Sequence, residues 1–308
     1  MSSQVQTRMP PIAVLSTLIL VLIFAGDQLS RKVILNQLTP LWSGSFAYTI
    51  AGVVLWMHAM WTHIEWRPAN RVSWLAHGVS GLLFLAVNVV GLYGVQQTLA
   101  SRAGVFIFTY PLFVALFGSL GSQGERPRSS VVMGMFLAFI GVVVLMSDRI
   151  KGAGATLWGD CLILTSAALL GLLIVHVRKV SRATSASQAI LWQITLSLPG
   201  FYLLSLYFEA IPTAMNHGTM WALLYQAIAI NSLGFLGRAM LITRYNANTV
   251  SSFFFLTPVL AVLFAWALLD DPLTIGMMFG GLIVGGGVLL TYLNNERTPV
   301  VSLKESAP

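Results

Sequence analysis

Two stretches of the chain, Pro111-Leu-Phe-Val-Ala-Leu-Phe117 and Pro258-Val-Leu-Ala-Val-Leu-Phe264, decide the fold because they are variants of one segment. They start 147 residues apart, from position 111 to position 258, which is close to half of the 308-residue chain. Further matches follow downstream at an offset of 146, and they pair Glu125 with Asp271, Gly134 with Gly280 and Gly141 with Gly287. Such internal similarity predicts that the two halves of the chain share one architecture.

The composition places this repeated architecture in a membrane. Hydrophobic residues make up 56% of the chain and charged residues 9%, and the mean hydropathy is +0.80. A soluble domain carries about 25% charged side chains, and a disordered chain needs low hydrophobicity, so both classes are excluded. The net charge of +7 is spread along the chain without a basic block, which argues against a nucleic-acid partner. The lone Cys161 excludes a disulfide framework and a multi-cysteine metal site.

A transmembrane helix needs about 20 mostly apolar residues, and the chain offers ten runs that meet this requirement. The expected spans are 11–35, 39–61, 72–96, 98–119, 129–147, 156–177, 186–208, 219–241, 247–269 and 273–293. Each half holds five spans, and because five is odd, the second half must insert upside down. The predicted fold is therefore an all-α integral membrane protein of ten transmembrane helices, arranged as two inverted five-helix repeats over 11–147 and 156–293.

The distribution of Lys and Arg predicts the orientation of these spans. Four of the 17 basic residues, Arg31, Lys32, Arg102 and Arg238, fall within or close to helices and are set aside. Of the other 13, all but Arg149 and Lys151 lie in loops on the side of the N-terminus. We therefore expect both termini in the cytoplasm.

Inverted repeats are typical of secondary transporters, whose substrate binds at the interface between the repeats. Duplication for stability alone is the other reading of the repeat. The motifs H-E-x-x-H and G-x-S-x-G and the P-loop are absent from the sequence, so we expect no enzyme, no cofactor and no metal site.

Arg238 and Asn231 are expected to share one face of the span 219–241. They are seven residues apart, which is nearly two full turns of an α-helix, and Gly234 on the same face would leave space in front of it. This predicts a cationic anchor for a carboxylate or phosphate in a central cavity. The alternative is that Arg238 lies near the helix end and extends to the headgroups.

Asp27 is the only carboxylate well inside an expected span, where a charge is costly. Three roles remain open for it. Arg31 lies four residues on and could pair with it structurally. Asp27 could instead meet Arg238 across an empty cavity and release it to substrate, or it could couple transport to protons.

Five further residues are candidates, each with an alternative role that is purely structural. Asn88 and Gln96 share a face of the span 72–96 and could contact substrate or make interhelical hydrogen bonds. Tyr110 precedes Pro111, and the equivalent Pro258 follows Thr257. Paired prolines in both halves predict cavity lining or gating, or simple kinks.

Two G-x-x-x-G spacings in the last span, at Gly276 with Gly280 and Gly281 with Gly285, allow close helix approach. They could serve internal packing or a homodimer.

Several short motifs carry a resemblance to a known family. They are Phe24-Ala25-Gly26-Asp27, Thr39-Pro40, Tyr110-Pro111-Leu112-Phe113, Gly124-Glu125-Arg126, Gly159-Asp160, Thr257-Pro258, Asp270-Asp271-Pro272 and Gly280 through Gly287. With them the chain resembles EamA-type members of the drug/metabolite transporter superfamily over about residues 11–293. It departs from the family where Phe24-Ala25-Gly26 replaces the usual Trp-Gly and where Asp271 replaces a common Glu.

The resemblance implies export of amino acids and related small molecules without ATP. We therefore expect a secondary transporter that works by alternating access in the plasma membrane, a bacterial inner membrane, with a small-molecule metabolite and membrane lipid as its partners. A carrier or flippase for phosphorylated or lipid-linked sugars is the alternative within transport. A non-transporting membrane sensor or subunit is the alternative from another class.

Overall fold

The computed structural model describes residues 9–98, 100–120, 127–147, 156–269 and 274–295. Within these ranges every regular element is a helix. Glu125, Asp271, Arg149 and Lys151, on which the repeat and the charge pattern partly rest, lie outside the described residues.

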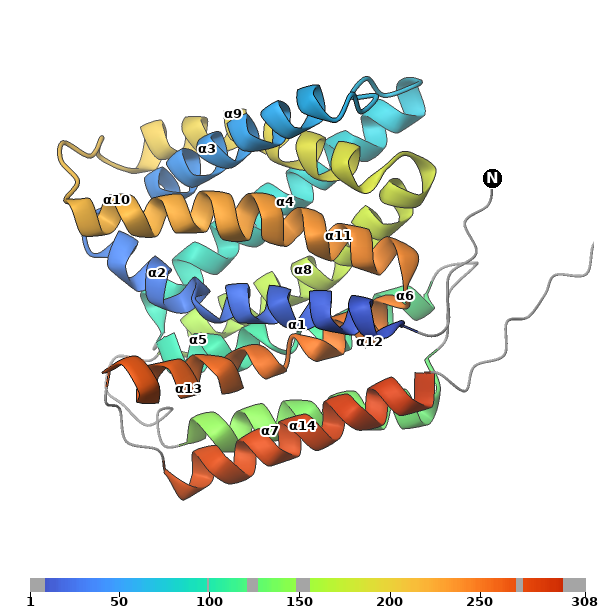
Figure 1. Ribbon diagram of the computed structural model, residues 1–308. Helices are drawn as coiled ribbons and strands as arrows, with labels where there is room; N and C mark the ends of the chain where they lie inside the picture. Colours follow the sequence, from blue (N-terminus) through green and yellow to red (C-terminus); the bar gives the residue numbers. More distant parts are fainter. Residues whose placement is uncertain (1–8, 99, 121–126, 148–155, 270–273, 296–308) are drawn as a thin grey trace, which may run out of the picture.

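The helices form one bundle, in which α4 and α8 run obliquely to α7 and α14 (Figure 1). The first half contains α1 (Pro11–Ala25), α2 (Asp27–Leu35), α3 (Pro40–Trp61), α4 (Arg71–Gln97), α5 (Ala100–Ile107), α6 (Tyr110–Ser119) and α7 (Ser129–Met146). The second half contains α8 (Leu157–Ala183), α9 (Ala186–Phe208), α10 (His217–Leu224), the π-helix η2 (Tyr225–Gly234), α11 (Phe235–Arg244), α12 (Ala247–Phe253), α13 (Leu256–Leu269) and α14 (Ile275–Asn295).

The outside of the bundle is apolar, and its inside contains polar side chains among the apolar ones. Leu82, Leu203 and Leu282 are each about two-thirds exposed or more, whereas Gln193 and Gln226 are buried. By length and composition, six helical segments of the described chain can cross a membrane. Because water would not tolerate so much exposed apolar surface, this is a multi-pass membrane protein.

Four of the ten expected spans are interrupted. The span 11–35 breaks at Gly26, between α1 and α2. The hydroxyl of Tyr225 donates a hydrogen bond of 2.6 Å to the carbonyl of Ile23, which also accepts from the Gly26 N–H at 3.3 Å where α1 ends. The break turns α2 away from the line of α1 and carries Asp27 and Arg31 with it.

The spans 98–119 and 247–269 break at equivalent points of the two halves. α5 ends just before the Tyr110-Pro111 pair that starts α6, and α12 ends shortly before Pro258 in the first turn of α13. Proline lacks an N–H and its ring clashes with the preceding turn, so a continuous α-helix is disfavoured at both places. The span 219–241 is interrupted differently, because η2 occupies its middle.

The helices α7 and α14 pack against each other through matched glycines. A Cβ on Gly134 would lie 2.9 Å from the carbonyl oxygen of Gly287, and one on Gly141 would lie 2.9 Å from that of Gly280. Since Gly134 matches Gly280 in the repeat and Gly141 matches Gly287, the contacts are reciprocal and the two helices antiparallel. This is the pattern that two copies related by a two-fold axis produce. Gly280 therefore serves internal packing.

Replacing Gly287 by alanine is expected to lower the stability of the bundle. The added methyl would collide with the backbone nitrogen of Ala138, and overpacking of this kind costs about 1–3 kcal/mol. Thermal unfolding in detergent measures the effect. Gly286→Ala is the matched control, because a Cβ there meets open space. Equal midpoints for the two variants would contradict the close α7–α14 contact.

The two described ends of the chain lie on the same side of the bundle (Figure 1). The hydroxyl of Tyr292, near the end of α14, donates to the carbonyl of Met9, just before α1, at 3.4 Å.

Candidate functional site

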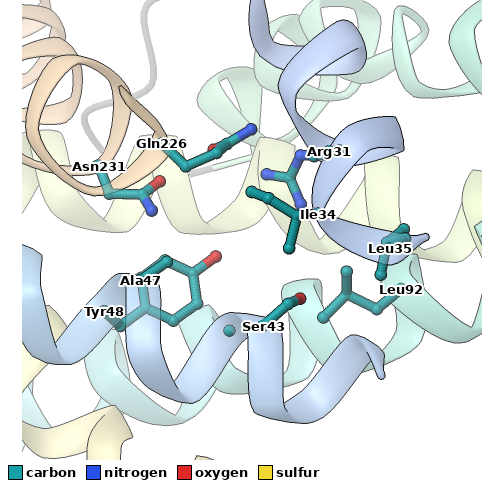
Figure 2. Close-up of a pocket in the computed structure, with 10 residues that line it drawn as sticks. Arg31, Ile34, Leu35, Ser43, Ala47, Tyr48, Leu92, Gln226 and Asn231 are labelled. Carbon is teal, nitrogen blue, oxygen red and sulfur yellow. The ribbon is translucent and has the colours of Figure 1, made fainter. Parts of the chain in front are cut away.

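Two pockets lie inside the bundle, toward its opposite ends. The first, here called the Arg31 pocket, has about 350 Å³ of unoccupied space including its mouth. Figure 2 shows its lining, which comes from α2, the start of α3, α4 and η2. The residues are Arg31, Ile34, Leu35, Ser43, Gly44, Ala47, Tyr48, Leu92, Gln226 and Asn231.

The charged group of the Arg31 pocket is an ion pair within α2. The Nε of Arg31 lies 3.0 Å from Oδ1 and 3.1 Å from Oδ2 of Asp27. The amide Nε2 of Gln226 donates to the same Oδ1 at 2.8 Å, to the Asp27 carbonyl at 3.1 Å and to the hydroxyl of Ser30 at 2.9 Å. Asp27 is thus seated between a guanidinium and an amide. In this structure Asp27 pairs with Arg31, which is the structural role among the three that the sequence left open.

Gln226 and Asn231 reach the Arg31 pocket because η2 is a π-helix. In an α-helix, residues five apart point about 140° away from each other. Hydrogen bonds from i to i+5 widen the turn and bring such residues to the same side. Gln226 was not among the sequence candidates, because in a regular α-helix its side chain would point away from that of Asn231.

Asn231 is 2% exposed, and its Oδ1 has no hydrogen-bond partner in the described part of the chain. It faces the Arg31 pocket from η2, across from the Arg31 side chain (Figure 2). An unpaired buried acceptor costs about 1–3 kcal/mol. Such a group in a pocket wall is available to a ligand.

Asn88 supports the Arg31 pocket from behind. The hydroxyl of Tyr48 donates to Asn88 Oδ1 at 2.6 Å, and Asn88 Nδ2 donates to the Phe84 carbonyl at 2.8 Å. Asn88 therefore orients the Tyr48 ring that lines the pocket. Gln96, its expected companion, is exposed near the end of α4 and lines neither pocket.

The second pocket, here called the Arg238 pocket, has about 270 Å³ of unoccupied space including its mouth. It lies between the end of α8, the start of α9 and α11. Its polar lining residues are Arg238 and Gln193, and the others are Leu173, Ile174, Val177, Ile190, Phe235, Ala239 and Ile242.

The Arg238 guanidinium is held by aromatic rings. It lies 5.7 Å from the ring centre of Phe24, 5.4 Å from that of Phe235 and 5.8 Å from that of Phe254. The buried hydroxyl of Tyr110 lies near it but forms no hydrogen bond within the described chain. No described carboxylate forms an ion pair with it. Cation–π contacts stabilise a desolvated guanidinium by about 2 kcal/mol and leave its charge uncompensated.

Two sequence expectations about Arg238 are wrong, and one of the three roles left open for Asp27 is not seen. Asn231 and Arg238 line different pockets, because the π-helix between them changes the phase that an α-helix would keep. Gly234 leaves no open space, since a Cβ on it would lie 2.9 Å from the ring of Phe24. Nor does Asp27 meet Arg238 in this state.

A layer of rings lies between the two pockets. Tyr48 of the Arg31 pocket contacts Phe84 with ring centres 4.8 Å apart, and Phe84 contacts Phe235 of the Arg238 pocket at 5.8 Å. Each pocket has room for about one water, so neither admits a metabolite without widening.

Glu209, just after α9, closes the end of the bundle near the Arg31 pocket. Its carboxylate accepts hydrogen bonds from the Thr39 hydroxyl at 2.6 Å and from the backbone N–H groups of Leu41 and Trp42 at 3.0 Å. A carboxylate at the N-terminus of α3 is favoured by the free N–H groups and the helix dipole.

Glu209→Gln is expected to destabilise the closed end by about 1–2 kcal/mol, because the charge at the start of α3 is lost. The melting temperature in detergent should fall accordingly. Glu65→Gln, at an exposed carboxylate, should leave it unchanged. A melting temperature for Glu209→Gln equal to that of the control would show that the hydrogen bonds of Glu209 to the start of α3 do not stabilise the protein.

Comparison with known proteins places this architecture in a family. The model of the EamA-like transporter family matches twice, over residues 11–147 and 157–293. The chain belongs to the EamA-like transporter family. It is therefore a transporter built from two EamA repeats, and its family and relatives are transporters and not enzymes.

Individual relatives agree with the family. An uncharacterized transporter of Archaeoglobus fulgidus is 27% identical over 90% of this chain and 96% of its own length. A protein of Escherichia coli named "probable amino-acid metabolite efflux pump" is 26% identical over 66% of this chain and 68% of its own. One solved crystal structure has the same fold, with a TM-score of 0.81 over 94% of this chain and 99% of the other, at 18% identity.

Proposed function

We propose that this EamA transporter exports amino acids or related small organic metabolites by alternating access. The observation that carries the proposal is the pair of pockets on either side of the Tyr48–Phe84–Phe235 layer, each with an arginine in its wall. Opening one pocket while the other stays closed moves a substrate past this layer. Such a movement needs hinges, and the breaks in four spans can provide them. These breaks lie at Gly26, before Pro111, before Pro258 and at η2.

The proposed topology has ten spans, in which α1 with α2, α5 with α6, α10 through α11, and α12 with α13 each form one broken span. The reciprocal contacts of the α7 and α14 glycines support an inverted relation of the repeats. The same-side position of the chain ends supports an even number of crossings. The positive-inside rule then puts both ends in the cytoplasm, in the plasma membrane, which we take to be a bacterial inner membrane.

The proposed substrate class follows from two relatives. The Escherichia coli relative and one of Salmonella typhimurium, 26% identical over 71% of this chain, are both named as amino-acid metabolite efflux pumps. The polar groups of the two pockets suit small molecules with a carboxylate, which Arg238 would attract through its uncompensated charge.

A carrier for phosphorylated or lipid-linked sugars is the weaker candidate. It needs several free cations around a phosphate, whereas Asp27 already neutralises Arg31. A non-transporting sensor or subunit would have no use for a pocket with an arginine in its wall toward each end of the bundle. We also propose no nucleic-acid partner. Gly285 and Gly286 face open space on α14, which leaves a face for lipid or for a homodimer.

Untargeted mass spectrometry of the culture medium tests the proposal. Cells that overexpress the wild type are compared with cells that carry an empty vector and cells that express the wild type at low level. Amino acids or related metabolites should accumulate in the medium in proportion to the transporter. The proposal fails if the medium is unchanged while the protein is confirmed in the membrane.

A further inference from the structure

We propose that the Arg238 pocket selects amino acids with apolar side chains, whose carboxylate binds Arg238 while the side chain lies against an apolar wall. The inference rests on the proposed export of amino acids. It adds which amino acids the protein carries and where their side chains are recognised. The recognising residues all line this one pocket.

The polar end of the Arg238 pocket consists of two side chains. The Arg238 guanidinium contacts three aromatic rings but forms no hydrogen bond within the described chain. The side chain of Gln193 is 3% exposed and forms no hydrogen bond there either. A guanidinium donates to a carboxylate, and an amide oxygen accepts from an ammonium. The head group of an amino acid therefore binds at this end.

The rest of the pocket wall is apolar and lies inside the bundle. Leu173 and Val177 of α8 and Ile190 of α9 are only 3–4% exposed, and Ile242 of α11 is 2% exposed. Among the described residues, Arg238 and Gln193 are the only polar side chains in this lining. A polar side chain placed here loses its water and gains no partner, whereas an apolar one is favoured.

The Arg31 pocket does not share this bias, because Ser43 and Gln226 are among the residues that line it. In alternating access a substrate enters both pockets and passes the ring layer between them. The pocket that tolerates polar side chains less then decides which amino acids cross. That pocket is the one at Arg238.

The Arg238 pocket lies where two apolar clusters of the core meet. Ile174 and Ile242 belong to one cluster, and Leu173, Val177 and Ile190 belong to the other. Walls that belong to separate clusters can move apart while each cluster stays packed. The pocket can therefore widen to admit an apolar side chain without the loss of either cluster.

Near-isosteric substrates test the selection. Full-length protein in proteoliposomes is loaded with the twenty proteinogenic L-amino acids, and efflux is followed by chromatography and corrected for leakage from protein-free liposomes. Leucine is compared with asparagine, valine with threonine and methionine with glutamine, because each pair shares the head group and differs in side-chain polarity. The apolar member should leave at least about tenfold faster, as expected when a polar group is buried without a partner.

A matched pair of variants tests the place of the selection. Val177→Thr puts a hydroxyl into the pocket wall, which gives a polar side chain a hydrogen-bond partner. The leucine-to-asparagine ratio should then fall by at least about threefold, which one hydrogen bond can supply. Val180→Thr is the control, because Val180 is equally buried in the same helix and apolar cluster but lines neither pocket. Its ratio should stay at the wild-type value.

Each remaining outcome has one meaning. Equal efflux within the three pairs, or faster efflux of the polar members, would overturn the inference while the proposed export stands. Equal ratios for Val177→Thr and Val180→Thr would place the selection outside this pocket and overturn it as well. If wild type releases none of the twenty amino acids, the proposed function fails, and the inference fails with it.

Discussion

Replacing Arg238 by alanine should reduce export by about 30-fold or more while the protein remains folded in the membrane. The Arg238 guanidinium is a charge without a carboxylate partner in the described chain, held among three phenylalanine rings beside a pocket. Loss of a buried charge that pairs with a ligand costs about 2–5 kcal/mol, and each 1.4 kcal/mol is about tenfold. Initial rates of accumulation in the medium, corrected for membrane abundance, measure the effect.

Two variants control this prediction. Arg244→Ala removes an exposed cation at the end of the same helix, and we expect export close to wild type. Arg238→Lys keeps the charge but loses the planar group that stacks on the rings, so it should give an intermediate rate. Equal rates for Arg238→Ala and Arg244→Ala would reduce Arg238 to a residue that anchors α11.

Replacing Asn231 by leucine is expected to separate stability from transport. The substitution removes a buried acceptor that has no partner among the described residues, so the free energy of unfolding should stay the same or rise by about 1–2 kcal/mol. Export should nevertheless fall by at least about tenfold, because the Arg31 pocket loses a group that faces the substrate. Melting temperature in detergent and efflux from proteoliposomes report the two effects on one preparation.

Ser232→Ala is the matched control for Asn231→Leu. Ser232 follows Asn231 on η2 and is fully buried, but its hydroxyl is bonded to the Ala227 carbonyl at 2.7 Å. This variant should lose a little stability and retain export. If Asn231→Leu behaves in the same way, Asn231 does not contact substrate.

Much of the fold could be predicted from apolar run length and from the repeat. The all-helical membrane bundle follows from the composition, and the glycines matched between the halves turn out to pack against each other in α7 and α14. The interruptions at Gly26 and η2 could not be predicted. A glycine in a long apolar run is compatible with a straight helix, and the π-helix has no clear sequence pattern.

The same interruptions decide which residues meet at the candidate site. Arg238 and Asn231 were identified because polar groups are costly in an apolar span, but a regular helix wrongly placed them together. Gln226 was missed because it reaches the Arg31 pocket only through the wide turn of η2, and Tyr48, on α3, was missed because the pocket that it lines is completed by the bent helix α2. Gln96 was wrongly favoured by helical spacing alone, which says nothing of where a helix leaves the core.

The central claim is that the two pockets open in turn, and site-directed labelling tests it most directly. In a Cys161→Ser background, which removes the one native cysteine, Ser43→Cys reports on the Arg31 pocket and Gln193→Cys on the Arg238 pocket. Maleimide labelling rates are measured with and without the compounds that wild type exports. Alternating access predicts that the compounds change the two rates in opposite directions. Rates that both rise, both fall or both stay constant would contradict the account.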